Sequence, residues 1–231
     1  MQPVIFQNRI DAGEKLAERL LLLEQSQLKE RDPQNIVIVG IPRGGVIIAD
    51  IIASKLGAKL DIVVSRKIGA PDNSELAIGA VMPNGSYFLN QEIVDRRNIP
   101  LDYIQEQASA QAKEIERRLT SYRGTKEYDN EFDGKTVVLV DDGIATGATM
   151  LASARWIKNE QHCKQLVIAV PVAPGEILTQ LKQVAEEVIV LDTPDPFIAI
   201  GRFYEDFDQV SDNQVKEIMK KYGYNIPHNR E

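Results

Sequence analysis

Residues 137–149, V-V-L-V-D-D-G-I-A-T-G-A-T, change character abruptly after four positions. The four leading residues are apolar β-formers, which predicts a strand buried on both faces. Two acids, two glycines and two threonines follow, and from Met150 onward apolar residues recur at helical spacing. The stretch therefore predicts a strand, a loop and a helix, with the loop at the carboxyl end of the strand.

The residue types of this loop suit a phosphate. The amino end of a helix leaves backbone N–H groups unpaired and carries partial positive charge. Gly143 and Gly147 let the backbone approach an anion closely, and the two threonines add hydroxyl donors. The two acids are hydrogen-bond acceptors that suit sugar hydroxyls or a hydrated magnesium ion. The loop therefore predicts a sugar-phosphate site.

The common nucleotide-binding loops fit these residues less well. A Walker loop needs a lysine and a hydroxyl after its second glycine, but Ala148 follows Gly147, which disfavours a phosphate-loop hydrolase. The G-x-G-x-x-G pattern of a dinucleotide fold is absent from the stretch. A sharp turn whose Asp-Asp-Gly only caps the next helix remains an alternative.

In order and type of residues, the stretch resembles the 5-phosphoribosyl-1-pyrophosphate (PRPP) signature of the type I phosphoribosyltransferase family. In that family the two acids hold the ribose hydroxyls, and the loop holds the 5′-phosphate. The resemblance implies that Asp141 and Asp142 are catalytic and contribute to a magnesium site. It implies donor binding by the loop residues Gly143, Ala145, Thr146, Gly147, Ala148 and Thr149.

A second loop of interest is G-I-P-R-G-G, residues 40–45, between a predicted strand at 36–39 and a predicted helix at 46–56. Loops at the carboxyl edge of a parallel sheet gather around one crevice, so this loop is expected to face the acidic one. In the family a loop at this place binds pyrophosphate, often through a non-proline cis peptide. The resemblance implies this role for Gly44, Gly45 and a catalytic Arg43. A tight turn with a surface arginine is the alternative.

The third strand is predicted over residues 60–65, and Arg66 and Lys67 follow at its carboxyl end. Two cations before a turn-rich segment suggest an electrostatic clamp with a mobile lid. The family has a flexible loop here, so the resemblance implies a lid over residues 68–80, with Arg66 and a catalytic Lys67 near the pyrophosphate. A β-hairpin is predicted over residues 77–89 in either case, and an ordinary hairpin with exposed cations is the alternative.

The segment after the last predicted strand is rich in aromatics and acids, which suggests the wall of a pocket. It loosely resembles the C-terminal segment of the purine-salvage members, where an aromatic covers the base and an acid assists magnesium. Phe197 and Asp206 would be the counterparts, with core packing of the aromatics as the alternative. Many family members carry a loop acid that assists proton transfer, but Thr146 is a hydroxyl here, so no general base is assigned.

These patterns predict an α/β fold: a mainly parallel open sheet with helices on both faces, a β-hairpin lid and a small C-terminal helical hood. Further helices are predicted over residues 11–27, 91–122, 175–185 and 211–222, and strands over residues 166–170 and 188–191. One domain is predicted over residues 1–231, with a core at about 30–192, the lid at 68–80, a helical insertion at 91–124 and a pocket segment at 193–231.

Composition limits the partners. The chain has 27 basic and 34 acidic residues, a net charge of −7, and no basic block mixed with aromatics, so nucleic acid is not expected as the main partner. The sequence lacks an apolar run long enough for a bilayer and a signal-like start, so a cytoplasmic protein without a membrane partner is expected. Family members are commonly dimers or tetramers, and the resemblance implies a homo-oligomer, most simply a dimer.

Over nearly its full length, the chain resembles a group of predicted phosphoribosyltransferases that carry I-P-R-G-G-V, R-K-I-G-A-P and E-L-A-I-G-A-V with the signature loop. The resemblance implies a transferase of nucleotide metabolism that uses PRPP and Mg²⁺, modifies a nitrogenous base or related acceptor, and releases pyrophosphate. The alternative is a PRPP- or nucleotide-sensing regulator without efficient catalysis. Such a regulator calls for an attached DNA-binding helix pair or a basic RNA face, and neither is found in this acidic chain.

Overall fold

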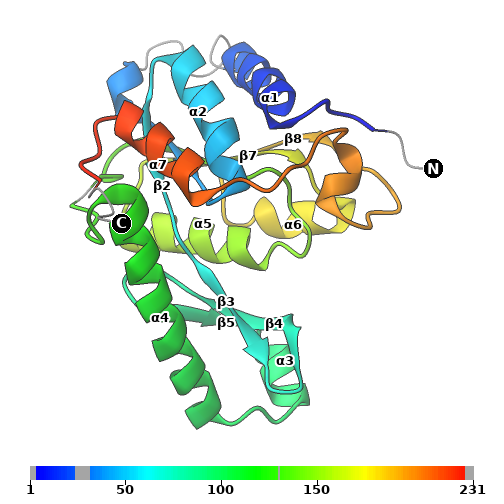
Figure 1. Ribbon diagram of the computed structural model, residues 1–231. Coiled ribbons are helices and arrows are strands. Elements are labelled where there is room, and N and C mark those ends of the chain that lie inside the picture. The colour runs from blue at the N-terminus through cyan, green and yellow to red at the C-terminus, as the bar shows by residue number, and fades with distance from the viewer. Residues whose placement is uncertain (1–3, 24–31, 130, 227–231) are drawn as a thin grey trace.

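The computed structural model describes residues 4–23, 32–129 and 131–226. Its main sheet has five parallel strands in the order β2-β1-β6-β7-β8 (Figure 1). The strands are β1 (Ile36–Gly40), β2 (Lys59–Ile62), β6 (Thr136–Val140), β7 (Gln165–Val172) and β8 (Glu187–Asp192). The predicted parallel α/β sheet is confirmed, and its strands at 36–39, 137–140, 166–170 and 188–191 all form.

Helices cover both faces of this sheet, as predicted. Ile38 and Val138 belong to a core shared with α1 (Arg9–Leu23) and α2 (Gly44–Leu56). The next residues along the same strands, Val39 and Leu139, belong to a second core shared with α5 (Ala148–Glu160) and α6 (Leu178–Leu181). Because successive strand residues point to opposite faces, the uninterrupted apolar runs fill two cores at once.

A second sheet is antiparallel and has the order β3-β4-β5. It consists of β3 (Arg66–Ala70), β4 (Asn73–Val81) and β5 (Tyr87–Leu89), and with α3 (Gln91–Arg96) and α4 (Leu101–Arg123) it projects from the main sheet in Figure 1. We call these elements the lobe. The strand predicted at 60–65 ends at Ile62. Arg66 and Lys67 are the first two residues of β3 and do not lie directly at the end of β2. Most of the segment 68–80 is strand rather than turn, because Ile68 and Ile78 are buried in the core.

Three predicted helices have different bounds in the structure. The helix at 91–122 is two helices, because Asn98 has a φ of 49° and Pro100 precedes the first residue of α4. The helix at 175–185 is reduced to the 3₁₀ turn η3 (Gly175–Ile177) and α6. The first helix begins at Arg9, where the Asn8 side chain accepts hydrogen bonds from the amides of Ile10 and Asp11, and residues 24–27 lie outside the described residues.

The C-terminal segment returns to the N-terminal one. After the 3₁₀ turn η4 (Ile200–Phe203), Tyr204 forms a parallel bridge with Phe6. The final helix α7 (Asp212–Lys221) lies where it was predicted and begins with a capping box between Ser211 and Gln214. One further 3₁₀ turn, η2 (Pro33–Asn35), precedes β1. Among the described helices, none has both the length and the apolar character that crossing a membrane requires.

Candidate functional site

The two predicted loops lie side by side at the carboxyl edge of the main sheet. Gly40 of β1 pairs with Val140 of β6, and the amide of Ile41 donates to the Val140 carbonyl at 2.9 Å. A Cβ placed on Gly45 would lie 2.8 Å from the Val140 oxygen and 3.0 Å from Oδ1 of Asp141. The amino end of α2 therefore approaches the acidic loop as closely as glycine permits. The Pro42–Arg43 peptide bond in the second loop is cis, as the resemblance implied.

The two acids differ in their surroundings. Burial raises the pKa of Asp141 well above its usual range, and the neighbouring charge of Asp142 raises it further. Burial also raises the pKa of Asp142, but the Arg9 guanidinium opposes this rise. Asp142 already has a positive partner in Arg9. A ligand that brings positive charge or hydrogen-bond donors would therefore stabilise the charged form of Asp141 more than that of Asp142.

Arg9 is a site residue that the sequence analysis missed. Its Nε donates to Oδ2 of Asp142 at 2.8 Å, and its Nη1 donates to the carbonyl of Asp208 at 2.7 Å. The guanidinium also lies 3.8 Å from the centre of the Phe207 ring, a cation–π contact. Arg9 stands 133 positions from Asp142, so no local pattern could have indicated the pairing.

Further contacts fix the position of Asp142. The hydroxyl of Tyr204 donates to the Asp142 carbonyl at 2.7 Å. A Cβ on Gly44 would overlap the Asp142 carboxylate, so this glycine makes room for the acid as well as for a ligand. The structure therefore divides the roles of the acidic pair: Asp141 borders the loop cavity, and Asp142 is held by Arg9.

The loop itself encloses a cavity of about 190 Å³. Every loop residue predicted to bind the donor lines it, namely Gly143, Ala145, Thr146, Gly147, Ala148 and Thr149. Gly147 has a φ of 78° and directly precedes α5, and the first two residues of that helix, Ala148 and Thr149, line the cavity. Gly143 has a packing role, because a Cβ there would lie 2.7 Å from Cγ2 of Ile200 and 3.0 Å from Cγ2 of Val172. Its small size makes room for the C-terminal segment.

Arg43 lies at the N-cap of α2 and is tied to the C-terminal helix. Its Nη1 donates to Oδ1 of Asp212 at 3.1 Å, and the hydroxyl of Tyr122 donates to the same oxygen at 2.8 Å. The Arg43 side chain remains 32% exposed, so it keeps access to solvent beside Gly44. The structure thus brings α2, α4 and α7 together at the second loop.

The other two predicted cations belong to the lobe. Nε of Arg66 donates to Oε1 of Gln111 on α4 at 2.8 Å, and burial together with the charge of Arg118 lowers the pKa of Arg66. Lys67 is exposed on β3. The lobe therefore determines where both cations lie relative to the acidic loop. Their contact with a donor stays a prediction.

Phe197 lies where the pocket wall was predicted. Its ring packs at an interplanar angle of 44° against the buried Phe203, with centroids 5.0 Å apart, and it lines a cavity of about 600 Å³. Ala145 and Thr146 of the phosphate loop line the same cavity. The aromatic side chain thus packs on the core and borders a pocket, so both predicted alternatives describe part of its environment.

Asp206 is not gathered with the acidic pair. It is exposed, its amide donates to the Gln7 carbonyl at 2.9 Å, and its Oδ1 accepts from the Asp208 amide at 3.2 Å. Within residues 4–23, 32–129 and 131–226, no three His, Cys, Asp or Glu side chains form a group that could hold a metal. The structure therefore does not bring Asp206 to Asp141 and Asp142, and the magnesium role of these two acids stays a prediction.

The comparison with known families agrees with this geometry. Residues 7–201 match the family model of the phosphoribosyl transferase domain. This chain belongs to the phosphoribosyl transferase domain family. Two Mycobacterium tuberculosis proteins (strains CDC 1551 / Oshkosh and H37Rv), provisionally named phosphoribosyl transferases, are each 36% identical over 217 residues, which are 94% of this chain and 47% of the relative. The chain thus spans about half the length of these curated relatives.

A solved structure extends the likeness to three dimensions. The crystal structure of TT1426 from Thermus thermophilus is 37% identical to this chain, with a TM-score of 0.77. The match covers 94% of this chain and 99% of that one. Membership of the phosphoribosyl transferase family and the type I-like fold implied by the sequence are therefore confirmed.

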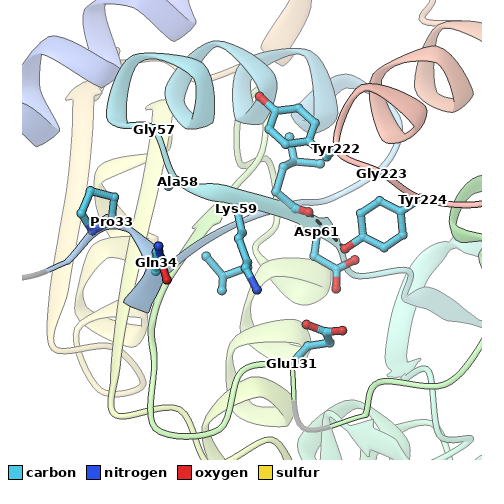
Figure 2. A pocket seen from close by; sticks show the side chains of 12 residues that line it. Pro33, Gln34, Gly57, Ala58, Lys59, Asp61, Glu131, Tyr222, Gly223 and Tyr224 are labelled. Carbon is cyan, nitrogen blue, oxygen red and sulfur yellow. Dashed lines mark hydrogen bonds between the residues drawn. The ribbon is translucent and has the colours of Figure 1, made fainter.

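A further cavity lies away from the candidate site (Figure 2). It has a volume of about 400 Å³ and lies beside the beginning of β2. Its lining mixes charges and hydroxyls from Lys59, Asp61, Glu131, Tyr222 and Tyr224. Because β1 and β2 begin here and the two loops of the site follow strand ends, this cavity is not part of the site.

Proposed function

We propose that the protein is a phosphoribosyltransferase that uses PRPP and Mg²⁺, transfers phosphoribose to a nitrogen of a base or related acceptor, and releases pyrophosphate. One observation carries this proposal. The amino ends of α2 and α5 follow two paired strands, β1 and β6, and Asp141 lies between them. Two helix amino ends with a carboxylate between them suit a sugar that carries a phosphate group at each end.

Each part of the donor has a matching group. The 5′-phosphate would bind the amides at the start of α5 and the hydroxyls of Thr146 and Thr149, which line the loop cavity. The ribose hydroxyls would donate to Asp141, whose raised pKa makes hydrogen-bond donors favourable. The pyrophosphate would lie at Gly44 and Gly45, next to the Arg43 guanidinium.

The residues present fit a magnesium ion that arrives with the donor. Mg²⁺ prefers oxygen ligands and is commonly held by one or two carboxylates together with phosphate oxygens and water. Asp141 offers such a carboxylate at the cavity, and Asp142 lies next to it in the chain. When bound, the ion would neutralise charge on the diphosphate.

In the proposed reaction, a nitrogen lone pair of the acceptor forms a bond to C1 of the ribose. The C1–O bond breaks, and pyrophosphate leaves with its electron pair. The Asp141 carboxylate would stabilise positive charge that develops on the sugar, and Arg43 would stabilise the departing anion. We expect the β3–β4 hairpin of the lobe to bring Arg66 and Lys67 closer and to exclude water.

Isothermal titration calorimetry with PRPP tests the proposal. The wild-type protein should bind PRPP in the presence of Mg²⁺, and Asp141→Asn should weaken the affinity by about tenfold or more, since hydrogen bonds to a charged group are worth roughly 1.5–3 kcal/mol. The matched control is Asp133→Asn, which changes an exposed acid in the turn before β6 and should leave binding unchanged. No saturation at millimolar PRPP would overturn the proposal.

A screen of free bases for pyrophosphate release then identifies the acceptor. Turnover with any base supports the transferase. PRPP binding without turnover by any base would favour the alternative, a PRPP-sensing regulator on the same fold. The expected dimer is checked separately by light scattering, and fractionation of the cell of origin checks the expected cytoplasmic location.

A further inference from the structure

The cavity beside the phosphate loop is built from three neighbouring strand ends. Ala145 and Thr146 follow β6, residues 174–176 follow β7, and residues 193–198 follow β8. These three strands are consecutive neighbours in the sheet, so the cavity lies at the same edge as both loops. It shares Ala145 and Thr146 with the loop cavity, so the two spaces are adjoining.

The lining of this cavity has charge of one sign. Its lining residues include two exposed acids, Glu176 and Asp195, and two exposed threonines, Thr146 and Thr193. Among the described residues that line it, none is Lys, Arg or His. A ligand with N–H donors or positive charge satisfies such acceptors, whereas a ligand carboxylate meets like charges without a counter-charge.

The walls of the cavity suit a flat ring. Phe197 is half-buried and held from behind by Phe203. Pro174, Pro194 and Pro196 also line the cavity, and proline rings are rigid and apolar. Flat apolar walls with a few polar groups at the rim are typical of sites for planar heterocycles.

We propose that the acceptor is a planar nitrogen heterocycle that bears amino or amide N–H groups and no carboxylate, and that Glu176 and Asp195 select it. This inference rests on the proposed function, because it takes the cavity next to the donor loop as the acceptor site. The carboxylates accept hydrogen bonds from the exocyclic N–H groups, and they repel an acidic analogue of the same ring. Selection thus works through attraction to one class and repulsion of the other.

Matched pairs of acceptors test this inference. Each pair keeps one ring and exchanges an amino or amide group for a carboxylate at the same position: nicotinamide with nicotinic acid, and adenine with purine-6-carboxylic acid. Binding is measured by saturation-transfer NMR with Mg²⁺ and ribose 5-phosphate, and turnover by pyrophosphate release with Mg²⁺ and PRPP. We expect the amino or amide member of at least one pair to be favoured by about tenfold or more.

Variants then assign the selection to the two acids. Glu176→Gln and Asp195→Asn remove charge with little change in size, and the double variant should bring the preference close to unity, mainly through the acceptor KM. PRPP affinity should stay unchanged in all three variants, and Glu14→Gln, an exposed change on α1, should keep the full preference. Thermal melting confirms that each variant is folded.

The outcomes separate this inference from the proposed function. Loss of PRPP binding in the wild-type protein would overturn the function itself. Intact PRPP binding combined with preference for the acidic members, with binding of neither class, or with an unchanged preference in the double variant would overturn the inference alone.

Discussion

Nε of Arg9 lies 2.8 Å from Oδ2 of Asp142, and both side chains are largely buried, at 11% and 14% exposure. This contact joins the first helix to Asp141 and Asp142 of the acidic loop. It supplies a positive charge next to two carboxylates that burial alone would favour in their neutral forms. Arg9 is therefore part of the electrostatics of the site although it belongs to no motif.

Replacing Arg9 should destabilise the protein. Arg9→Gln removes the ion pair with Asp142 and the cation–π contact with Phe207, and it leaves a buried carboxylate without its partner. We expect a loss of about 1–3 kcal/mol in the free energy of unfolding, measured by urea denaturation. Lys15→Gln on the same helix breaks a more exposed pair with Asp11 and should cost below about 0.5 kcal/mol. Equal costs for the two variants would contradict this account.

Asp141→Asn should make the ligand-free protein more stable at neutral pH. Burial and the charge of Asp142 raise the native pKa of Asp141 above its unfolded value, so the native state binds more protons between these two values. Stability of the wild-type protein should therefore fall as the pH rises through that window, and the Asn variant lacks this contribution. Thermal melting from pH 4 to pH 8 should show the advantage of the variant increasing with pH.

The control for this pH series is Gln180→Ala, an exposed change on α6 that involves no titratable group, so its stability difference from the wild-type protein should stay constant. An advantage of Asp141→Asn that shrinks as the pH rises would show that the carboxylate is stabilised in the fold. In that case the surroundings of Asp141 could not be as described.

Gly44→Ala should disturb the second loop and the acidic pair together. The added methyl group would overlap the Asp142 carboxylate and lie 2.9 Å from Nε of Arg9. We expect a cost of about 1–3 kcal/mol from overpacking and weaker PRPP binding. Gly175→Ala, where nothing lies within 4 Å of the new Cβ, is the stability control and should be close to neutral. Similar melting temperatures for both variants would argue against the close approach of α2.

A buried ion pair anchors the lobe. Nε and Nη2 of Arg123 at the end of α4 donate to the two oxygens of Asp61 on β2 at 2.7 and 2.9 Å, with both side chains 2% exposed. Arg123→Met strands a buried carboxylate and should cost about 3–5 kcal/mol in chemical denaturation. The double variant with Asp61→Leu should regain most of that loss, because no unpaired charge remains. Additive losses in this cycle would contradict the pairing.

The sequence was most informative where a pattern is local. The runs at 36–39 and 137–140 are apolar without interruption, and each fixes a central strand that is buried on both faces. The loops that follow are defined by glycine and charge within a few residues, so their place at one sheet edge followed from topology. The capping box at Ser211 is equally local, and the final helix was predicted within a residue of its bounds.

Features that depend on distant residues could not be predicted. Arg9 and Tyr204 reach Asp142 from opposite parts of the chain, and no spacing rule connects them. Gly143 belongs to a loop whose local sequence predicts phosphate binding. Nothing local indicates that this glycine also makes room for Ile200. The break between α3 and α4 did have a local signal, because Pro100 lies inside the predicted helix. The residue before a proline is disfavoured in a helix, so this proline indicates where the break falls.

The acidic loop is completed by residues from both sides of the sequence: Arg9 precedes it, and Tyr204 follows Asp142 by 62 positions. Arg43 likewise finds its partner only at Asp212. A ribosome that makes this protein releases the acidic loop well before residues 204–212. The nascent chain therefore carries the loop without Tyr204 and Asp212, and on the proposed function its binding of a sugar phosphate would be completed late in translation.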